Sequence, residues 1–171
     1  MANLIRNRQI EADRWQRLEL DAGGALPSVP ADGDVIVPLA LWQARHDALA
    51  ARTGKTGVWL NSNEGPETIA ADLARLPLVA INFPSIGDGR GLSTARLLRE
   101  RHGYTGEIRA IGTVIKDLLL GMHRCGIDTF LLREDQDPRD ALRAFDELGD
   151  PYQASVVQPQ PLFRRRLAGV A

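Results

Sequence analysis

The chain has 171 residues, of which 44% are hydrophobic and 25% charged, the composition of a globular protein that buries a core. A formal net charge of −1 gives no general attraction for nucleic acid or for an anionic membrane surface, so we expect neither as a partner. The single cysteine excludes an internal disulfide, and no apolar run reaches the roughly 20 residues that a bilayer span requires. Because MANLIRNRQI also lacks the apolar centre of a signal peptide, we expect a cytoplasmic protein.

The first 33 residues predict a hairpin followed by a linker. Two short extended pieces, NLIRN (3–7) and WQRLEL (15–20), flank a polar turn, as the strands of a β-hairpin do. The glycines, prolines and aspartates of DAGGALPSVPADGD (21–34) then predict an irregular loop.

From residue 34 onward, short apolar runs alternate with longer amphipathic runs. The apolar runs, which we predict as strands, are 34–39, 56–61, 78–84, 107–112, 129–132 and 154–158. The amphipathic runs, which we predict as helices, are 41–53, 66–76, 92–103, 113–126 and 137–148. Pro66 and Pro138 suit the first turn of a helix, and Gly103 and Gly126 suit the position after the last turn.

This alternation predicts an α/β fold, in which consecutive βα units form a mainly parallel sheet after the short N-terminal β-hairpin. A doubly wound open sheet and a partial barrel produce the same sequence pattern, so both architectures stay open. We expect one α/β domain over 1–171, with the hairpin and linker in 1–33, the βα core in 34–158 and a C-terminal arm in 159–171.

The glycine-rich turn GDGRGLS (87–93) is the candidate binding site, because ligands of parallel α/β folds bind beyond the carboxyl ends of the strands. Its glycines allow a ligand to approach backbone N–H groups at a helix start, and Arg90 offers a guanidinium suited to an oxyanion. We expect Arg90 to face Thr113 and Lys116. The predicted ligand-binding residues are Asp88, Gly89, Arg90, Gly91, Ser93, Arg109 and Thr113. The alternative is a purely structural turn, with Asp88 or Ser93 as helix cap and Arg90 in solvent.

Arg109 is a charged residue within a strand that we predict to be buried. A buried guanidinium requires a carboxylate partner, and Asp88, Glu107 and Asp128 are the candidates.

The remaining reactive side chains point to structural roles. His46, His102 and His123 lack the spacing of a metal site, so no metal is predicted. Cys125 lies on the apolar face of the predicted helix 113–126, which predicts a buried and slowly reacting thiol.

The segment DGRGLSTARLLRERHGYTGEIRAIG (88–112), together with RCGIDTF (124–130), resembles a family of uncharacterised bacterial proteins labelled as oxidoreductases involved in sulfite reduction. The Asp-Gly-Arg-Gly turn and the serine two residues after it match that family's pattern. The chain departs from the pattern at Gly112-Thr113 and at Asp117-Leu118, where members commonly have Gly-Asp and Asp-Gln. A carboxylate and an amide are therefore missing from the loop that follows the predicted strand 107–112.

The resemblance implies a role in assimilatory sulfite reduction. Six-electron reduction of sulfite requires sirohaem, iron–sulfur clusters or flavin, and a chain of this size with one cysteine is not itself the reductase, so no cofactor is predicted. We therefore expect an accessory protein that binds the sulfite reductase, another sulfur-assimilation protein or a small oxyanion. The alternative is a small α/β enzyme that acts on a phosphorylated or carboxylated metabolite, with Asp88, Lys116 and Asp117 as candidate catalytic residues.

Overall fold

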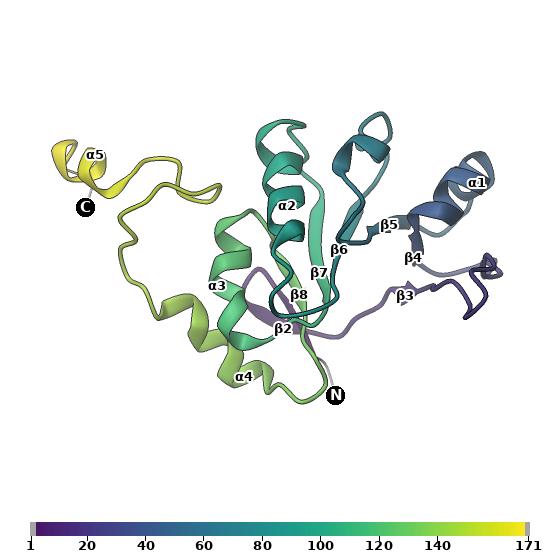
Figure 1. The fold of residues 1–171 in the computed structure, drawn as a ribbon, viewed down its shortest axis with the longest axis horizontal. Coiled ribbons are helices and arrows are strands. Elements are labelled where there is room, and N and C mark those ends of the chain that lie inside the picture. The colour runs from purple at the N-terminus through teal and green to yellow at the C-terminus, as the bar shows by residue number, and fades with distance from the viewer. Residues whose placement is uncertain (1–2, 170–171) are drawn as a thin grey trace.

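The computed structural model describes residues 3–169, which form a mixed α/β fold around one curled, half-barrel sheet (Figure 1). The strands are β1 (Leu4–Arg6), β2 (Gln9–Glu11), β3 (Gln16–Arg17), β4 (Val35–Pro38), β5 (Thr56–Leu60), β6 (Leu78–Phe83), β7 (Glu107–Gly112) and β8 (Thr129–Leu131). The helices are α1 (Leu39–Ala50), α2 (Arg90–Glu100), α3 (Lys116–Arg124), α4 (Pro138–Ala141) and α5 (Leu162–Leu167), with 3₁₀ helices η1 (Pro66–Ile69) and η2 (Leu142–Asp146). None of the described helices is long and apolar enough to cross a membrane.

The order of the strands across the sheet is β2-β1-β8-β7-β6-β5-β4-β3. Strands β3 to β8 are parallel to one another, whereas β1 is antiparallel to both β2 and β8. The predicted α/β fold with a mainly parallel sheet and an N-terminal hairpin is thus confirmed. Because β4 to β8 follow one another in chain order, the sheet has no point where the order reverses, which is the arrangement of a (β/α) barrel.

The two faces of the sheet are covered differently, which decides between the two architectures. Val79, Ile81 and Phe83 of β6 belong to the main core, together with side chains of α1, α2 and α3. The alternate residues Leu78 and Ala80 face the other side, where they pack in a small cluster without any helix. A doubly wound sheet carries helices on both faces. The partial barrel is therefore correct, and the doubly wound sheet is excluded.

Residues 12–15 run from β2, at one edge of the sheet, to β3, at the opposite edge. On this helix-free inner face, Trp15 and Trp59 pack against the small apolar cluster. The indole N–H of Trp59 donates to the carbonyl of Leu18 at 2.9 Å, just beyond β3. The N-terminal segment therefore supplies the cover that helices supply on the other face.

Arg109 lies in the middle of β7 on the inner face and is completely buried. Its partner in register on β6 is Ala80, a small residue that leaves room for the long side chain. Its Nη1 donates to both carboxylate oxygens of Asp13 at 2.9 Å, and its Nε donates to Glu107 at 2.8 Å. The predicted partner Glu107 is confirmed, and Asp13 is a partner that the sequence did not suggest.

The other two candidate partners of Arg109 bind different arginines. Asp88 pairs with Arg90 at 2.7 Å, and Asp128 pairs with Arg99 at 2.6 Å. Both of those predictions for Arg109 are therefore wrong.

The hairpin exists, but its second strand is not the one predicted. Its turn consists of Asn7 and Arg8, which both have positive φ angles, as a tight two-residue hairpin turn requires. This turn pairs β1 with β2. The predicted second strand, 15–20, instead contributes β3 at the far edge of the sheet.

Three predicted elements near the helical face and the C-terminus also differ. The predicted helix 66–76 is helical only in η1, and the predicted helix 137–148 is divided between α4 and η2. The predicted strand 154–158 is irregular, because β1 already occupies the edge of β8 that it would have joined. The C-terminal arm contains α5, which stands away from the sheet and its helices (Figure 1).

Candidate functional site

The glycine-rich turn lies where the sequence predicts it, at the carboxyl edge of the parallel sheet and at a helix start. Strand β6 ends at Phe83, and α2 begins at Arg90 with Gly89 as its N-cap residue. A Cβ atom on Gly91 would come within 2.8 Å of side-chain atoms of Ile81 and Phe83. Gly91 therefore lets the first turn of α2 pack directly against β6.

Arg90 is held by contacts at this edge. Its Nε and Nη2 donate to the two carboxylate oxygens of Asp88 at 2.9 and 2.7 Å, and Nη2 also donates to Ser62 at 2.9 Å. The hydrogen bonds from Arg90, and then the one from Ser62, hold the pKa of Asp88 well below its usual range. The charge of Arg90 is therefore compensated by a carboxylate in the same turn.

The other predicted residues of this edge are also engaged or exposed. The hydroxyl of Thr113 donates to the carbonyl of Pro84 at 3.2 Å, and the ammonium of Lys116 donates to Asp140 at 3.1 Å. Ser93 and Asp117 are exposed residues in the first turns of α2 and α3. The expected meeting of Arg90 with Thr113 and Lys116 is replaced by these separate contacts, and Arg109 lies away from this edge, on the inner face of β7.

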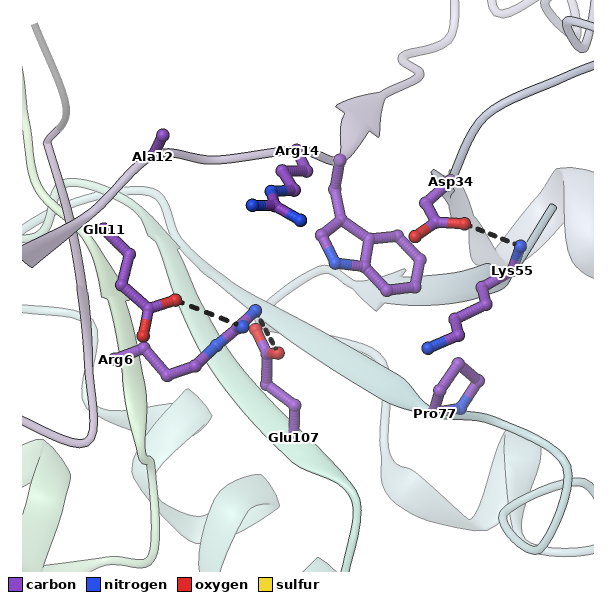
Figure 2. Close-up of a pocket in the computed structure, with 9 residues that line it drawn as sticks. Arg6, Glu11, Ala12, Arg14, Asp34, Lys55, Pro77 and Glu107 are labelled. Carbon is purple, nitrogen blue, oxygen red and sulfur yellow. Dashed lines mark hydrogen bonds and ion pairs between the residues drawn. The ribbon is translucent and has the colours of Figure 1, made fainter.

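A polar cavity of about 560 Å³ lies at the opposite, amino-terminal edge of the sheet (Figure 2). We call it the amino-end pocket. Asp34, Lys55 and Pro77 immediately precede β4, β5 and β6, and Glu107 is the first residue of β7. The lining residues are Arg6, Glu11, Ala12, Arg14, Trp15, Asp34, Lys55, Pro77 and Glu107.

The cations of the amino-end pocket differ in how they are compensated. Arg6 donates to Glu11 at 3.3 Å and to Glu107 at 2.7 Å, as the dashed lines of Figure 2 show. Within residues 3–169, the side chains of Arg14 and Lys55 form no ion pair, since the Lys55 contact with Asp34 uses its backbone N–H. The pocket therefore offers one compensated cation and two free ones.

Two buried guanidinium N–H groups near this pocket also lack an acceptor. Among the described residues, Arg6 Nε and Arg109 Nη2 are buried without a hydrogen-bond partner, and both arginines bind the pocket residue Glu107. Leaving a buried donor unpaired costs about 1–3 kcal/mol, so an acceptor brought by a ligand or by water would stabilise this region.

The side chains that line the amino-end pocket are suited to binding an anionic small molecule. Two free cations and the indole of Trp15 can hold an anionic group and pack against an apolar or planar part of the same molecule. Within residues 3–169, no three histidine, cysteine, aspartate or glutamate side chains come together in a way that could hold a metal ion.

Sequence reasoning missed the amino-end pocket because it considered only the carboxyl ends of the strands. One signal of this pocket was present in the sequence: Asp34 begins the apolar run 34–39, and Lys55 directly precedes the run 56–61. The neighbouring Arg14-Trp15 pair carried no such signal, since its place over the inner face follows from the path of residues 12–15.

Comparison with known proteins assigns the chain to a family. No curated protein matches the chain. Residues 57–163, more than half of the sequence, match the model of a family described as a bacterial protein of unknown function, DUF934. The matched region contains the glycine-rich turn, whereas most residues that line the amino-end pocket precede it. The chain therefore belongs to the DUF934 family of bacterial proteins.

Proposed function

We propose that this chain is a cytoplasmic accessory protein of assimilatory sulfite reduction that binds a small molecule carrying an oxyanion in the amino-end pocket. The resemblance described for residues 88–112 and 124–130 supports the link to sulfur assimilation. The composition of the pocket supports a ligand with an anionic group.

The observation that carries the proposal is the difference in charge pairing between the two edges of the sheet. At the carboxyl edge, Arg90 and Lys116 each face a carboxylate at 2.7 and 3.1 Å. In the amino-end pocket, Arg14 and Lys55 have no carboxylate partner among residues 3–169. A free cation beside a cavity attracts an anion more strongly than a cation that is already paired.

The size of the pocket narrows the class of ligand. A cavity of about 560 Å³ falls within the roughly 300–1,000 Å³ range of small-molecule sites. A bare sulfite or phosphate ion would fill only a small part of that volume. The expected ligand therefore carries its oxyanion on an organic body, which packs against Trp15.

The contacts at the carboxyl edge favour binding over the enzyme alternative. A proton carrier works best when its pKa lies near the working pH. The pKa of Asp88 is well below that range because of its hydrogen bonds from Arg90 and Ser62, and Lys116 is engaged by Asp140. Asp117 is the one catalytic candidate of the three that is exposed in the first turn of its helix.

A direct test is a fluorescence titration of the purified chain with phenyl phosphate, which combines an oxyanion with a planar ring. We expect saturable quenching in the wild type, loss of that signal in Trp15→Phe, and a weakening of about tenfold or more in Arg14→Gln/Lys55→Gln. Arg101→Gln is the control, because Arg101 is exposed and lies 3.8 Å from Glu67, outside the pocket. Equal binding by the pocket variant and the control would overturn the proposed site.

The link to sulfur metabolism is tested in the cell. In a strain lacking the gene, growth rescued by sulfide but not by sulfite would place the defect at sulfite reduction. We expect the wild-type gene and the Arg101→Gln gene to restore growth on sulfite and the Arg14→Gln/Lys55→Gln gene to fail. Normal growth of the deletion strain on sulfite would contradict the assignment to sulfite reduction, whatever the result of the titration.

A further inference from the structure

Helix α5 of the C-terminal arm and the neighbouring residues 150–152 form an exposed surface that combines aromatic and aliphatic side chains. The rings of Tyr152 and Phe163 lie 6.3 Å apart, and these residues are 61% and 46% exposed. Leu167, at the end of α5, is 86% exposed. We call this surface, with the arginines of α5, the arm tip. Adjacent exposed apolar residues of this kind are typical of a surface that binds another protein.

The arm tip is held together by contacts between α5 and residues 150–152. The N–H of Leu162 donates to the carbonyl of Tyr152 at 3.1 Å, and Arg165 pairs with Asp150 at 2.9 Å. These contacts fold α5 back onto residues 150–152. Figure 1 shows the resulting unit standing apart from the sheet and from α2 and α3. The arm tip is therefore a small ordered unit that leaves its apolar side chains uncovered by the rest of the chain.

The arm tip is strongly basic. It carries three consecutive arginines, Arg164, Arg165 and Arg166, and residues 159–169 contain no acidic residue. Of these three arginines, only Arg165 forms an ion pair within the described part of the chain. Two unpaired guanidinium groups beside exposed apolar side chains fit an acidic surface with an apolar floor.

A surface of that chemistry exists elsewhere on the same chain. A groove of about 950 Å³ lies between the N-terminal hairpin and the start of α4, and no residue of the arm lines it. Its charged lining residues are Glu134, Asp135, Asp137 and Arg139. Asp135 is already paired with Arg133 at 2.5 Å. Glu134 and Asp137 form no ion pair among the described residues, since the side chain of Asp137 accepts only the backbone N–H of Arg139, so the uncompensated carboxylates outnumber Arg139. Its apolar part includes Pro138 and Ile10, which is 37% exposed. We call this the acidic groove.

We propose that the arm tip of one copy docks into the acidic groove of a second copy, so that two chains exchange their arms. Arg164 and Arg166 would face Glu134 and Asp137, and the apolar side chains of the tip would cover Ile10. Each copy carries one tip and one groove, so two such contacts related by a two-fold axis close a symmetric dimer. Neither surface belongs to the amino-end pocket, so this interaction is independent of the proposed ligand.

The test is a charge-reversal experiment on the full chain, read out by light scattering and sedimentation. We expect the wild type to dimerise, with an affinity that falls as salt is added. Arg164→Glu/Arg166→Glu reverses the tip, and Glu134→Lys/Asp137→Lys reverses the groove. Each variant alone should dimerise at least about tenfold more weakly than the wild type. An equimolar mixture of the two should regain wild-type affinity as a heterodimer, because both exchanged contacts then join opposite charges.

The matched control is a charge reversal away from both surfaces. Arg143→Glu reverses an arginine whose side chain is 80% exposed and lies outside both surfaces, so it should leave dimerisation unchanged. Circular dichroism spectra check that every variant is folded. A monomeric wild type would overturn the proposal. A dimer that persists in both single-surface variants, or a mixture that fails to regain the affinity, would overturn it as well.

Discussion

Arg109 and Asp13 are 96 residues apart in the sequence, and both oxygens of the Asp13 carboxylate accept hydrogen bonds at 2.9 Å from one nitrogen of the buried guanidinium. Arg109 comes from the centre of the sheet, and Asp13 comes from the segment that crosses its inner face. This pair therefore fixes the N-terminal segment over a face that no helix covers, and it also places the neighbouring residues Arg14 and Trp15 at the amino-end pocket.

The first prediction concerns the stability supplied by this pair. Asp13→Ala should lower the free energy of unfolding by about 1–3 kcal/mol, because it leaves a buried N–H group of Arg109 without its acceptor while Glu107 still compensates the charge. Urea denaturation measures the loss. Arg109→Met in the same chain should recover part of it, since an apolar side chain of similar length does not need a charged partner.

The control for that prediction is an exposed ion pair. Asp146→Ala removes the partner of Arg8 at the surface and should cost only about 0–1 kcal/mol. Equal losses for Asp13→Ala and Asp146→Ala would mean that the buried pair does not fasten the N-terminal segment.

The second prediction concerns the glycine at the start of α2. Gly91→Ala would place a methyl group 2.8 Å from side-chain atoms of Ile81 and Phe83, and this overpacking should cost about 1–3 kcal/mol. Gly121 lies inside α3 with open space around its Cα, so Gly121→Ala should instead stabilise the chain by about 0.5–1 kcal/mol. Thermal unfolding of both variants checks the opposite signs.

The third prediction is a pH dependence at His46. Its ring nitrogens lie 3.1 Å from Asp47 and 2.9 Å from Asp72, and these hydrogen bonds raise the pKa of His46 above 6.5. A raised pKa in the folded state stabilises the protein fully below pH 6.5, and the stabilisation is lost as the pH rises through the folded-state pKa. His46→Gln should therefore be less stable than the wild type in mildly acidic solution, with the difference closing above neutral pH.

His123 provides the opposite case for the same experiment. Burial lowers the pKa of His123 below 6.5 in the folded state. The stabilisation that the buried, neutral His123 gives to the folded state is therefore present above pH 6.5, and it is lost as the pH falls through the folded-state pKa. The stability of His123→Leu relative to the wild type should improve toward acid pH, where that of His46→Gln worsens. Parallel trends for the two variants would contradict these assignments.

The fourth prediction concerns the Asp88–Arg90 pair. The pKa of Asp88 lies below its ordinary 3.8, so the stabilisation by this pair is present above pH 3.8 and is lost as the pH falls below it. Because the Arg90 side chain is 63% exposed, Arg90→Ala should lower the melting temperature only slightly at neutral pH. The difference from the wild type should vanish in acid, and NMR titration should find the pKa of Asp88 raised in the variant.

The fifth prediction concerns Cys125. Burial raises the pKa of its thiol, and the side chain packs against the main core, so the reactive thiolate is scarce at neutral pH. We expect slow modification by a thiol reagent in the native chain and fast modification after unfolding in urea. Fast labelling of the native chain would point to a redox role instead.

The βα core could be predicted from the sequence because its signals are local. The apolar run 107–112 coincides with β7, and the run 78–84 contains β6, since a strand covered on both faces shows as a continuous apolar stretch. The place of β3 could not be predicted in this way. The predicted strand 15–20 contains β3, at Gln16 and Arg17, but the sequence pairs that strand with 3–7, whereas its place beside β4 follows from the contacts of the whole N-terminal segment.

In the candidate site, too, the features set by local sequence could be predicted and those set by long-range contacts could not. The sequence placed the glycine-rich turn correctly at the carboxyl edge, because strand, turn and helix follow one another along the chain. The pairing of Arg90 with Asp88 is a contact between side chains within one turn, and the sequence instead predicts that Arg90 faces Thr113 and Lys116 or solvent. The amino-end pocket could not be predicted, because Arg14, Lys55 and Glu107 meet there only after the sheet has curled and residues 12–15 have crossed it.

The position of β1 has a consequence for the order in which the chain folds. β1 is synthesised before all the other strands of this sheet, yet its neighbour β8, at residues 129–131, is synthesised after all of them. Until then the hairpin of β1 and β2 lacks the strand that holds it at the edge of the sheet, and an isolated two-stranded hairpin is marginally stable at best. Contacts between residues so far apart in sequence also form slowly. β1 and β2 precede the other strands of the sheet in sequence and are thus among the last to find their place, and until β8 has been made the β1 edge of the hairpin lacks its partner.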